Sequence, residues 1–155
     1  MAKEHHKNHG VLFDYNGVLV IGHEAASNLA AVLAALDGEF KLGIVTRSWR
    51  ADVQRMLERE NIAQYFHAII AAEDLSASKP DPDGYLQGIK ALNLPAQHIV
   101  AVEDTPTGVQ AAQAAGLRCI AVEPEPGSDR LAGAAASIKN LSELTPAFVH
   151  EIIAS

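Results

Sequence analysis

Short apolar runs recur along the chain, and a helix-like stretch separates each run from the next. The runs at 11–13, 41–45, 66–71, 98–102 and 118–122 are mostly apolar, which is typical of strands buried on both faces. Such strands alternating with helices predict a parallel sheet that helices cover on both sides. We therefore expect an α/β fold, a three-layer α/β/α Rossmann-like sandwich with a mostly parallel sheet of about five to six strands.

The stretches between the runs carry helix signals. Apolar spacing and proline near the helix start predict helices over Glu24–Leu36, Arg50–Asn61, Pro82–Leu92, Pro106–Ala115 and Pro146–Ala154. Gly38 and Gly116 stand where the first and fourth of these helices should stop. Ser137–Lys139 is a candidate for a short sixth strand.

A chain of 155 residues is about the size of one domain, and we expect a flexible tail over 1–9 and a core domain over 10–155. The net charge of −7 and the aromatic content of 5% disfavour nucleic-acid binding and binding to anionic membranes. Cys119 is the only cysteine, so no intrachain disulfide can form. The N-terminus lacks the apolar run of a signal peptide, and we expect a cytoplasmic protein.

Polar residues follow the predicted strands at their carboxyl ends, where open α/β sheets bind ligands. These residues are Asp14, Asn16, Thr46, Lys79, Glu103 and Asp104. Carboxylates that converge at one edge repel one another unless a divalent cation joins them, and oxygen-only ligands suit Mg²⁺. A lysine and a threonine hydroxyl beside that ion would hold phosphate oxygens, and Gly17 leaves space for phosphate near the main chain.

In this arrangement Asp14 can attack phosphorus and form an aspartyl-phosphate, while Lys79 and Mg²⁺ neutralise the developing charge. Each residue alone has a simpler interpretation. Asp14 could be a turn residue, Thr46 a helix cap and Lys79 a solvated surface charge. Their joint occurrence at one sheet edge favours phosphoryl transfer, with Arg47 as a further candidate contact to substrate phosphate.

Four segments resemble the motifs of the haloacid dehalogenase-like hydrolases. They are FDYNGVL at 13–19, GIVTRS at 43–48, SKPDPDGY at 78–85 and AVEDTPTGVQAAQAAGL at 101–117. The last two resemble the phosphatase and phosphoglucomutase-like branch of that superfamily in particular. The resemblance runs from about residue 10 to about residue 140, nearly the whole chain. It implies a Mg²⁺-dependent phosphatase that works through an aspartyl-phosphate.

The resemblance also implies metal ligands. Asp14 and Asp104 supply carboxylates to Mg²⁺, and the position of Asn16 supplies a backbone carbonyl. Glu103 is either a second acidic ligand or the group that holds a metal-bound water.

The remaining motif residues are implied to act on the phosphoryl group. Asp14 matches the nucleophile, Thr46 the phosphate-binding hydroxyl, and Lys79 the lysine that pairs with both nucleophile and phosphate.

Asn16 departs from the family pattern. Family phosphatases have a second aspartate here, which protonates the leaving oxygen and then activates water, whereas an amide cannot exchange a proton in that way. Such acid–base assistance is worth ~10² to 10⁴ in rate. We therefore expect a phosphatase that is weak or confined to good leaving groups such as aryl and acyl phosphates. The alternative is an impaired relative that binds a phosphorylated ligand or a protein.

The chain also lacks room for a cap. Relatives with these motifs carry a helical cap domain between the first two motifs, but here only Val20–Phe40 lie between them. The site should be open, and should admit either a small or a large phosphorylated substrate, or be covered by a second copy in a homo-oligomer. A cap supplied by a second copy, a natural loss and an engineered deletion all account for the gap.

Two other classes fit less well. A phospho-accepting receiver domain uses Asp, Thr, Lys and Mg²⁺, but its acidic pair comes early in the chain, whereas Glu103 and Asp104 follow Lys79. Dehalogenase chemistry needs no Mg²⁺, so the Glu103–Asp104 pair argues against it.

Overall fold

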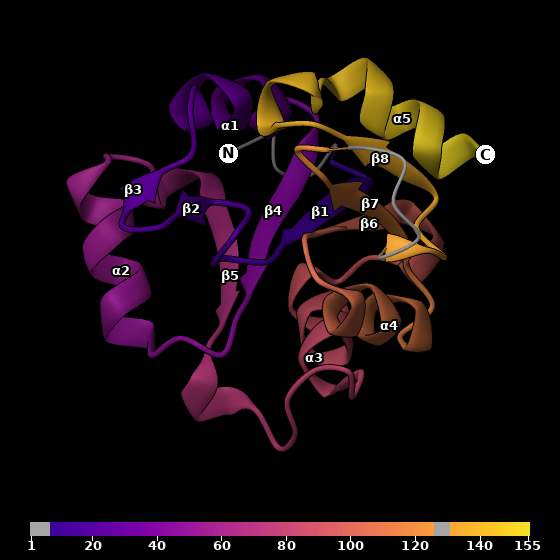
Figure 1. Ribbon diagram of the computed structural model, residues 1–155, viewed down its shortest axis with the longest axis horizontal. Helices are drawn as coiled ribbons and strands as arrows, with labels where there is room; N and C mark the ends of the chain where they lie inside the picture. Colours follow the sequence, from indigo (N-terminus) through magenta and orange to yellow (C-terminus); the bar gives the residue numbers. More distant parts are fainter. Residues whose placement is uncertain (1–6, 126–130) are drawn as a thin grey trace.

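A six-stranded parallel sheet forms the centre of the molecule (Figure 1). The computed structural model describes residues 7–125 and 131–155. In spatial order the strands are β5 (Phe66–Ile70), β4 (Phe40–Val45), β1 (His9–Phe13), β6 (Ile99–Glu103), β7 (Arg118–Val122) and β8 (Ala136–Ile138). The predicted sandwich and its parallel sheet are confirmed.

Helices cover both faces of the sheet (Figure 1). On one face lie α1 (Leu29–Asp37), α2 (Arg50–Arg59) and α5 (Pro146–Ala154), and on the other lie α3 (Asp83–Leu92) and α4 (Pro106–Ala114). Short 3₁₀ helices span Ala63–Tyr65, Ala72–Asp74, Ala96–His98 and Leu141–Glu143. No helix of the described segments is long and apolar enough to cross a membrane.

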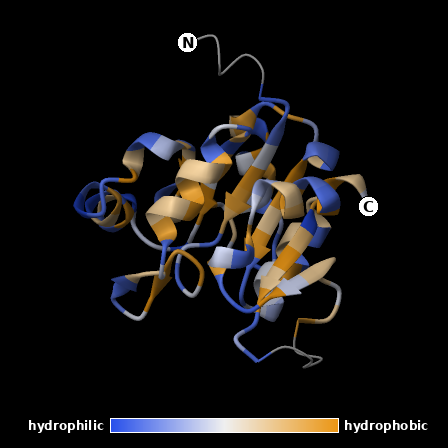
Figure 2. Cartoon of the chain, turned by 90° about the horizontal axis from the view of Figure 1, so that it is seen from above, coloured by the Kyte–Doolittle hydropathy of each residue, from blue (hydrophilic) through white to orange (hydrophobic). Residues whose placement is uncertain are grey.

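Strand β1 shows why the apolar runs become the middle of the sheet. Val11 and Phe13 pack into the cluster under α1, α2 and α5, whereas Leu12 packs into the cluster under α3 and α4. All three side chains are fully buried, because successive residues of a strand point to opposite faces. The central strands are accordingly hydrophobic in Figure 2. This packing anchors the polar residue that follows, Asp14, at the end of the strand.

The predicted helix over Glu24–Leu36 is wrong in its first turn. Glu24–Ala25 forms strand β3, which pairs antiparallel with β2 (Val20–Ile21), and α1 begins only at Leu29. Glutamate and alanine favour helices, but the pairing with Val20–Ile21 overrides that preference. This β2–β3 hairpin and α1 are the only elements between β1 and β4 in the described chain, so no separate helical domain lies there.

The first described strand begins within the range predicted as a tail. Strand β1 begins at His9, and the Lys7 ammonium, also buried, pairs with Asp37 at 3.2 Å. The predicted flexible tail, 1–9, thus overlaps the folded part at its last residues. Residues 1–6 lie outside the described part, so the tail remains a prediction for them.

Candidate functional site

The carboxyl ends of β1, β4 and β6 surround a cavity of about 290 Å³, which we call the Asp14 cavity. Its lining residues are Asp14, Asn16, Thr46, Arg47, Lys79, Thr105 and Thr107. Asp14 is held directly after β1, since its backbone N–H donates to the Val102 carbonyl at 3.0 Å. Thr46 is held after β4 by donation of its N–H to the Ile70 carbonyl at 2.9 Å. Backbone bonds of the sheet therefore position both side chains.

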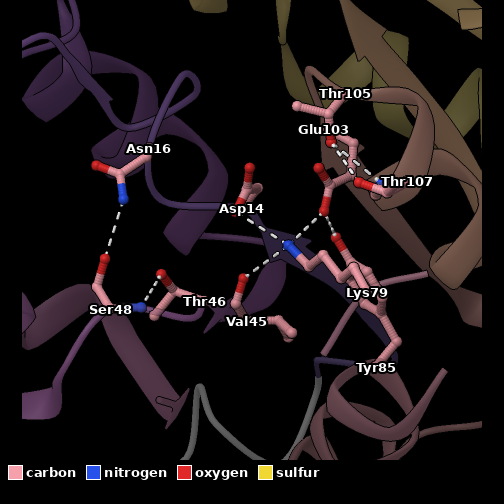
Figure 3. A network of polar contacts seen from close by, with 11 residues as sticks. Asp14, Asn16, Val45, Thr46, Ser48, Lys79, Tyr85, Glu103, Thr105 and Thr107 are labelled. Atoms are coloured by element: carbon pink, nitrogen blue, oxygen red, sulfur yellow. Dashed lines mark hydrogen bonds and ion pairs between the residues drawn. The ribbon is translucent and has the colours of Figure 1, made fainter. Parts of the chain in front are cut away.

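Lys79 joins the carboxylates of two strands (Figure 3). Its Nζ lies 3.0 Å from Asp14 Oδ1 and 2.6 Å from Glu103 Oε2, and it also donates to the Val45 carbonyl at 3.2 Å. Burial lowers the pKa of the Lys79 ammonium, but the charges of Asp14 and Glu103 outweigh burial and leave this pKa above its usual value. Lys79 is thus a cation fixed beside the Asp14 carboxylate.

Three carboxylates lie close together at this position, and two of them are the partners of Lys79. Asp14, Glu103 and Asp104 each offer an oxygen, and these oxygens all lie within 4.8 Å of one another. Burial first, and then the proximity of Asp14, raises the pKa of the Glu103 and Asp104 carboxyl groups. Lys79 is one cation beside three carboxylates, so the cluster is electrostatically costly unless a further cation binds.

The acidic cluster has spare ligand atoms. Glu103 Oε1 and Asp104 Oδ1 are buried and have no hydrogen-bond partner in the described part of the chain. Two glycines leave room for these carboxylates, because an added Cβ would lie 1.8 Å from Asp104 Oδ2 at Gly17 and 1.9 Å from Glu103 Oε1 at Gly108. Unpartnered carboxylate oxygens at this spacing fit a hard divalent cation such as Mg²⁺.

Tyr85 completes the buried side of the cluster. Its hydroxyl donates to Glu103 Oε2, and Lys79 Nζ lies 5.3 Å from the centroid of its ring. Burial, followed by the Glu103 charge, raises the pKa of the Tyr85 hydroxyl well above its usual value. Tyr85 therefore stays neutral and acts as a hydrogen-bond donor.

Asn16 lies on the opposite wall of the Asp14 cavity (Figure 3). Its Nδ2 donates to Ser48 Oγ at 3.0 Å, and the Ser48 backbone N–H donates to Thr46 Oγ1 at 3.0 Å. This chain of hydrogen bonds links Asn16 to the turn that follows β4, and it leaves the amide oxygen for other contacts.

The structure brings together all the candidate residues of the sequence analysis, in two groups: those that line the Asp14 cavity and those that lie beside it. Asp14, Asn16, Thr46, Arg47 and Lys79 line the Asp14 cavity. Glu103 and Asp104 lie within reach of Asp14 but do not line that cavity.

Four contributors to the site were not foreseen, namely Ser48, Tyr85, Thr105 and Thr107. The sequence does contain a signal for the position of Thr105, because threonine before proline is typical of a helix start. Its Oγ1 accepts a hydrogen bond from the Gly108 N–H at the beginning of α4. The sequence contains no such signal for Tyr85, because it resembles any apolar position of α3.

Comparison with known proteins identifies the family of the chain. Residues 5–122 match the family model described as haloacid dehalogenase-like hydrolase. Validoxylamine A 7'-phosphate phosphatase from Streptomyces hygroscopicus subsp. limoneus is 34% identical over 103 residues, which cover 66% of this chain and 48% of that protein. Beta-phosphoglucomutase from Bacillus subtilis is 30% identical over 127 residues, which cover 79% of this chain and 53% of that protein.

Among solved structures, CbbY from Rhodobacter sphaeroides in complex with phosphate aligns with a TM-score of 0.69 at 27% identity, covering 77% of this chain and 56% of that one. The chain spans about half the length of the curated relatives named above, 48% and 53%. The matched region includes all four motifs and every residue of the Asp14 cavity. The chain belongs to the haloacid dehalogenase-like hydrolase family.

Proposed function

We propose that the chain is a Mg²⁺-dependent phosphatase that forms an aspartyl-phosphate on Asp14. The observation that carries the proposal is the position of Asp14, which is paired with Lys79 at 3.0 Å and opens into a cavity that Thr46 and Arg47 also line. A carboxylate, two cations and a hydroxyl around one space form a site for a phosphoryl group.

Each residue has a task in this proposal. Asp14 attacks phosphorus, and its Oδ1 contact with Lys79 orients the carboxylate. The Lys79 ammonium and the Arg47 guanidinium offset the charge that develops on the phosphoryl oxygens, and the Thr46 hydroxyl donates to one of them. Thr46 as a whole residue is only 2% exposed, so its side chain has little room to move.

Asp14, Glu103 and Asp104 would hold Mg²⁺, with the backbone carbonyl of Asn16 as a further proposed ligand. When bound, Mg²⁺ supplies electrostatic stabilisation of phosphoryl oxygens. Glu103 would either bind the ion directly or hold a metal-bound water. Its Oε1, which has no hydrogen-bond partner in the described residues, is compatible with both roles.

The substrate is proposed to be a phosphorylated molecule that enters without a lid. The relatives named above include a phosphatase that acts on validoxylamine A 7'-phosphate and a beta-phosphoglucomutase, which supports a phosphorylated small molecule. The hairpin and α1 between β1 and β4 leave the mouth open to larger phosphorylated substrates or to a second copy of the chain. We also propose that the protein is cytoplasmic. Its single cysteine, Cys119, is free and buried, which fits a reducing compartment.

The test is a phosphate-release screen over many phosphomonoesters, with and without Mg²⁺. We expect release that needs both Mg²⁺ and Asp14, so that Asp14→Asn abolishes it. Asp37→Asn is the matched control, since Asp37 ends α1 and pairs with Lys7, outside the Asp14 cavity. Equal release by the parent chain and Asp14→Asn would contradict the proposal.

A second candidate is a protein that binds a phosphorylated ligand and turns it over hardly at all. Asn16, whose amide is engaged with Ser48, favours it. Calorimetric binding of p-nitrophenyl phosphate together with absent hydrolysis in Mg²⁺ would support this function over the first.

A further inference from the structure

The described residues that line the Asp14 cavity include a nucleophile, Asp14, but no second group that can take a proton from water. Besides Asp14 its described lining residues are an amide, two cations and three threonines. Arginine and an ion-paired lysine are donors, and threonine hydroxyls are far too weakly basic to serve. Once Asp14 carried a phosphoryl group, none of these residues could act as a general base.

The two other carboxylates of the acidic cluster, Glu103 and Asp104, do not line the Asp14 cavity, although each has one oxygen without a hydrogen-bond partner in the described residues. Glu103 is fully buried, and its Oε2 already accepts hydrogen bonds from Lys79 and Tyr85. Asp104 lines a neighbouring cavity of about 410 Å³ that also contains Gly17 and Lys139. Neither lines the space in which water would approach phosphorus on Asp14.

No histidine is among the described residues that line the Asp14 cavity. His23, at the tip of the β2–β3 hairpin, instead lines a third cavity with Tyr15 and Arg59. Asn16 contributes to both spaces, but its Nδ2 donates to Ser48 Oγ at 3.0 Å, and an amide neither accepts nor releases a proton in this pH range.

We propose that, with an acyl phosphate as donor, the phosphoryl group moves to Asp14 faster than water removes it, so that the covalent phosphoprotein accumulates. This inference rests on the proposed function. The substrate class follows from the chemistry of the leaving group, because a departing carboxylate needs no proton.

The reaction has two steps, transfer of the phosphoryl group to Asp14 and its hydrolysis by water. In the first, an oxygen of Asp14 forms a bond to phosphorus, the bond from phosphorus to the acyl oxygen breaks, and the acyl group leaves as a carboxylate. In the second, the oxygen of water forms a bond to phosphorus, the bond from phosphorus to Asp14 breaks, and Asp14 leaves as a carboxylate. The water proton passes to a positioned base or, without one, to bulk solvent. A positioned base accelerates such a step by about 10² to 10⁴. The described lining of the cavity provides no such base, so only the second step is slow.

The experiment measures the phosphoprotein directly. The full chain is incubated with Mg²⁺ and acetyl phosphate, quenched in acid and analysed by intact mass spectrometry, with released phosphate followed in parallel. We expect the parent chain to carry one phosphoryl group, Asp14→Asn none, and Asn16→Asp an occupancy at least about tenfold lower because its new carboxylate can act as a base. Asn61→Asp, an exposed change after α2, is the control and should match the parent.

A chase provides an independent readout. After acetyl phosphate is removed, we expect the label to decay about 10²-fold faster in Asn16→Asp than in the parent chain. Imidazole added to the parent should accelerate the decay, because the open cavity admits a small external base. This arm remains informative if Asn16→Asp does not fold.

The outcomes separate the two proposals. Asp14-dependent release of phosphate without accumulated phosphoprotein would overturn this inference and leave the proposed phosphatase standing. Neither release nor label in any variant would overturn the proposed function, and the inference with it.

Discussion

The hydroxyl of Tyr85 donates a hydrogen bond to the same oxygen of Glu103, Oε2, that lies 2.6 Å from Lys79 Nζ. Both Tyr85 and Glu103 are fully buried. One carboxylate oxygen thus accepts from two donors while the other, Oε1, has no partner in the described residues. The hydroxyl thus helps to hold Oε2 toward the lysine, while Oε1 lies beside Gly108.

Tyr85→Phe should therefore destabilise the fold by about 1–3 kcal/mol, because it removes a hydrogen bond to a buried charged group without changing the ring. Urea unfolding measures the loss. Tyr65→Phe is the control, since this tyrosine is only partly buried, and it should change stability by less than about 0.5 kcal/mol. Equal effects of the two variants would refute a special role for the Tyr85 hydroxyl.

Gly108→Ala should displace Glu103. The added Cβ would lie 1.9 Å from Glu103 Oε1, and Glu103 is fully buried, so either α4 or the carboxylate must move. We expect a loss of about 1–3 kcal/mol in unfolding free energy from overpacking. Gly38→Ala is the matched control, because Gly38 has helical dihedral angles and its nearest atom would be 4.0 Å away. Thermal unfolding of both variants provides the comparison, and equal midpoints would contradict the expected clash.

Mg²⁺ should stabilise the chain through the acidic cluster. At a concentration 100 times its dissociation constant it adds about 2.7 kcal/mol, or roughly 5–10 °C in midpoint for a chain of this size. Asp104→Asn should lose most of that rise, yet without Mg²⁺ it should be at least as stable as the parent, since one of three clustered charges is gone. Scanning fluorimetry with and without Mg²⁺ tests both arms. A Mg²⁺ response that survives in Asp104→Asn would place the ion elsewhere.

A histidine cluster lies at the amino-terminal edge of the sheet. The His9 ring centroid lies 5.1 Å from that of His98 and 5.3 Å from that of His150, while Glu39 contacts His150 at 3.0 Å. Burial first, and then His150 and His98, lowers the pKa of His9. The folded chain then binds fewer protons than the unfolded chain, so stability should fall as pH drops below about 6.5 and level off below the folded pKa.

His9→Phe keeps a ring beside Phe40 and removes the titrating group. We expect its urea midpoint to fall less than that of the parent between about pH 7.5 and about pH 5.5. Parallel pH profiles of the two proteins would show that the cluster does not control this dependence.

The sheet was predictable because its strands are buried on both faces and local sequence suffices to mark them. The β2–β3 hairpin was not, since Glu24–Ala25 favours helix by local preference and becomes a strand only through its pairing with Val20–Ile21. Asp14, Thr46 and Lys79 could be found because each follows a predicted strand. Tyr85 could not, because its task depends on Glu103, a partner 18 residues away on another element.

The β2–β3 hairpin has a consequence for how this fold can be extended. Gly22 at its tip has φ 67°, and a Cβ there would have no neighbour within 4 Å. Ile21 and Glu24 pair across the hairpin, so the chain leaves and re-enters the core at adjacent points, about 5 Å apart. A folded module with neighbouring termini could be spliced into this turn without stretching the sheet. A module inserted at this hairpin could contact new substrates, while Asp14 and Lys79 would keep their positions at the ends of the sheet strands.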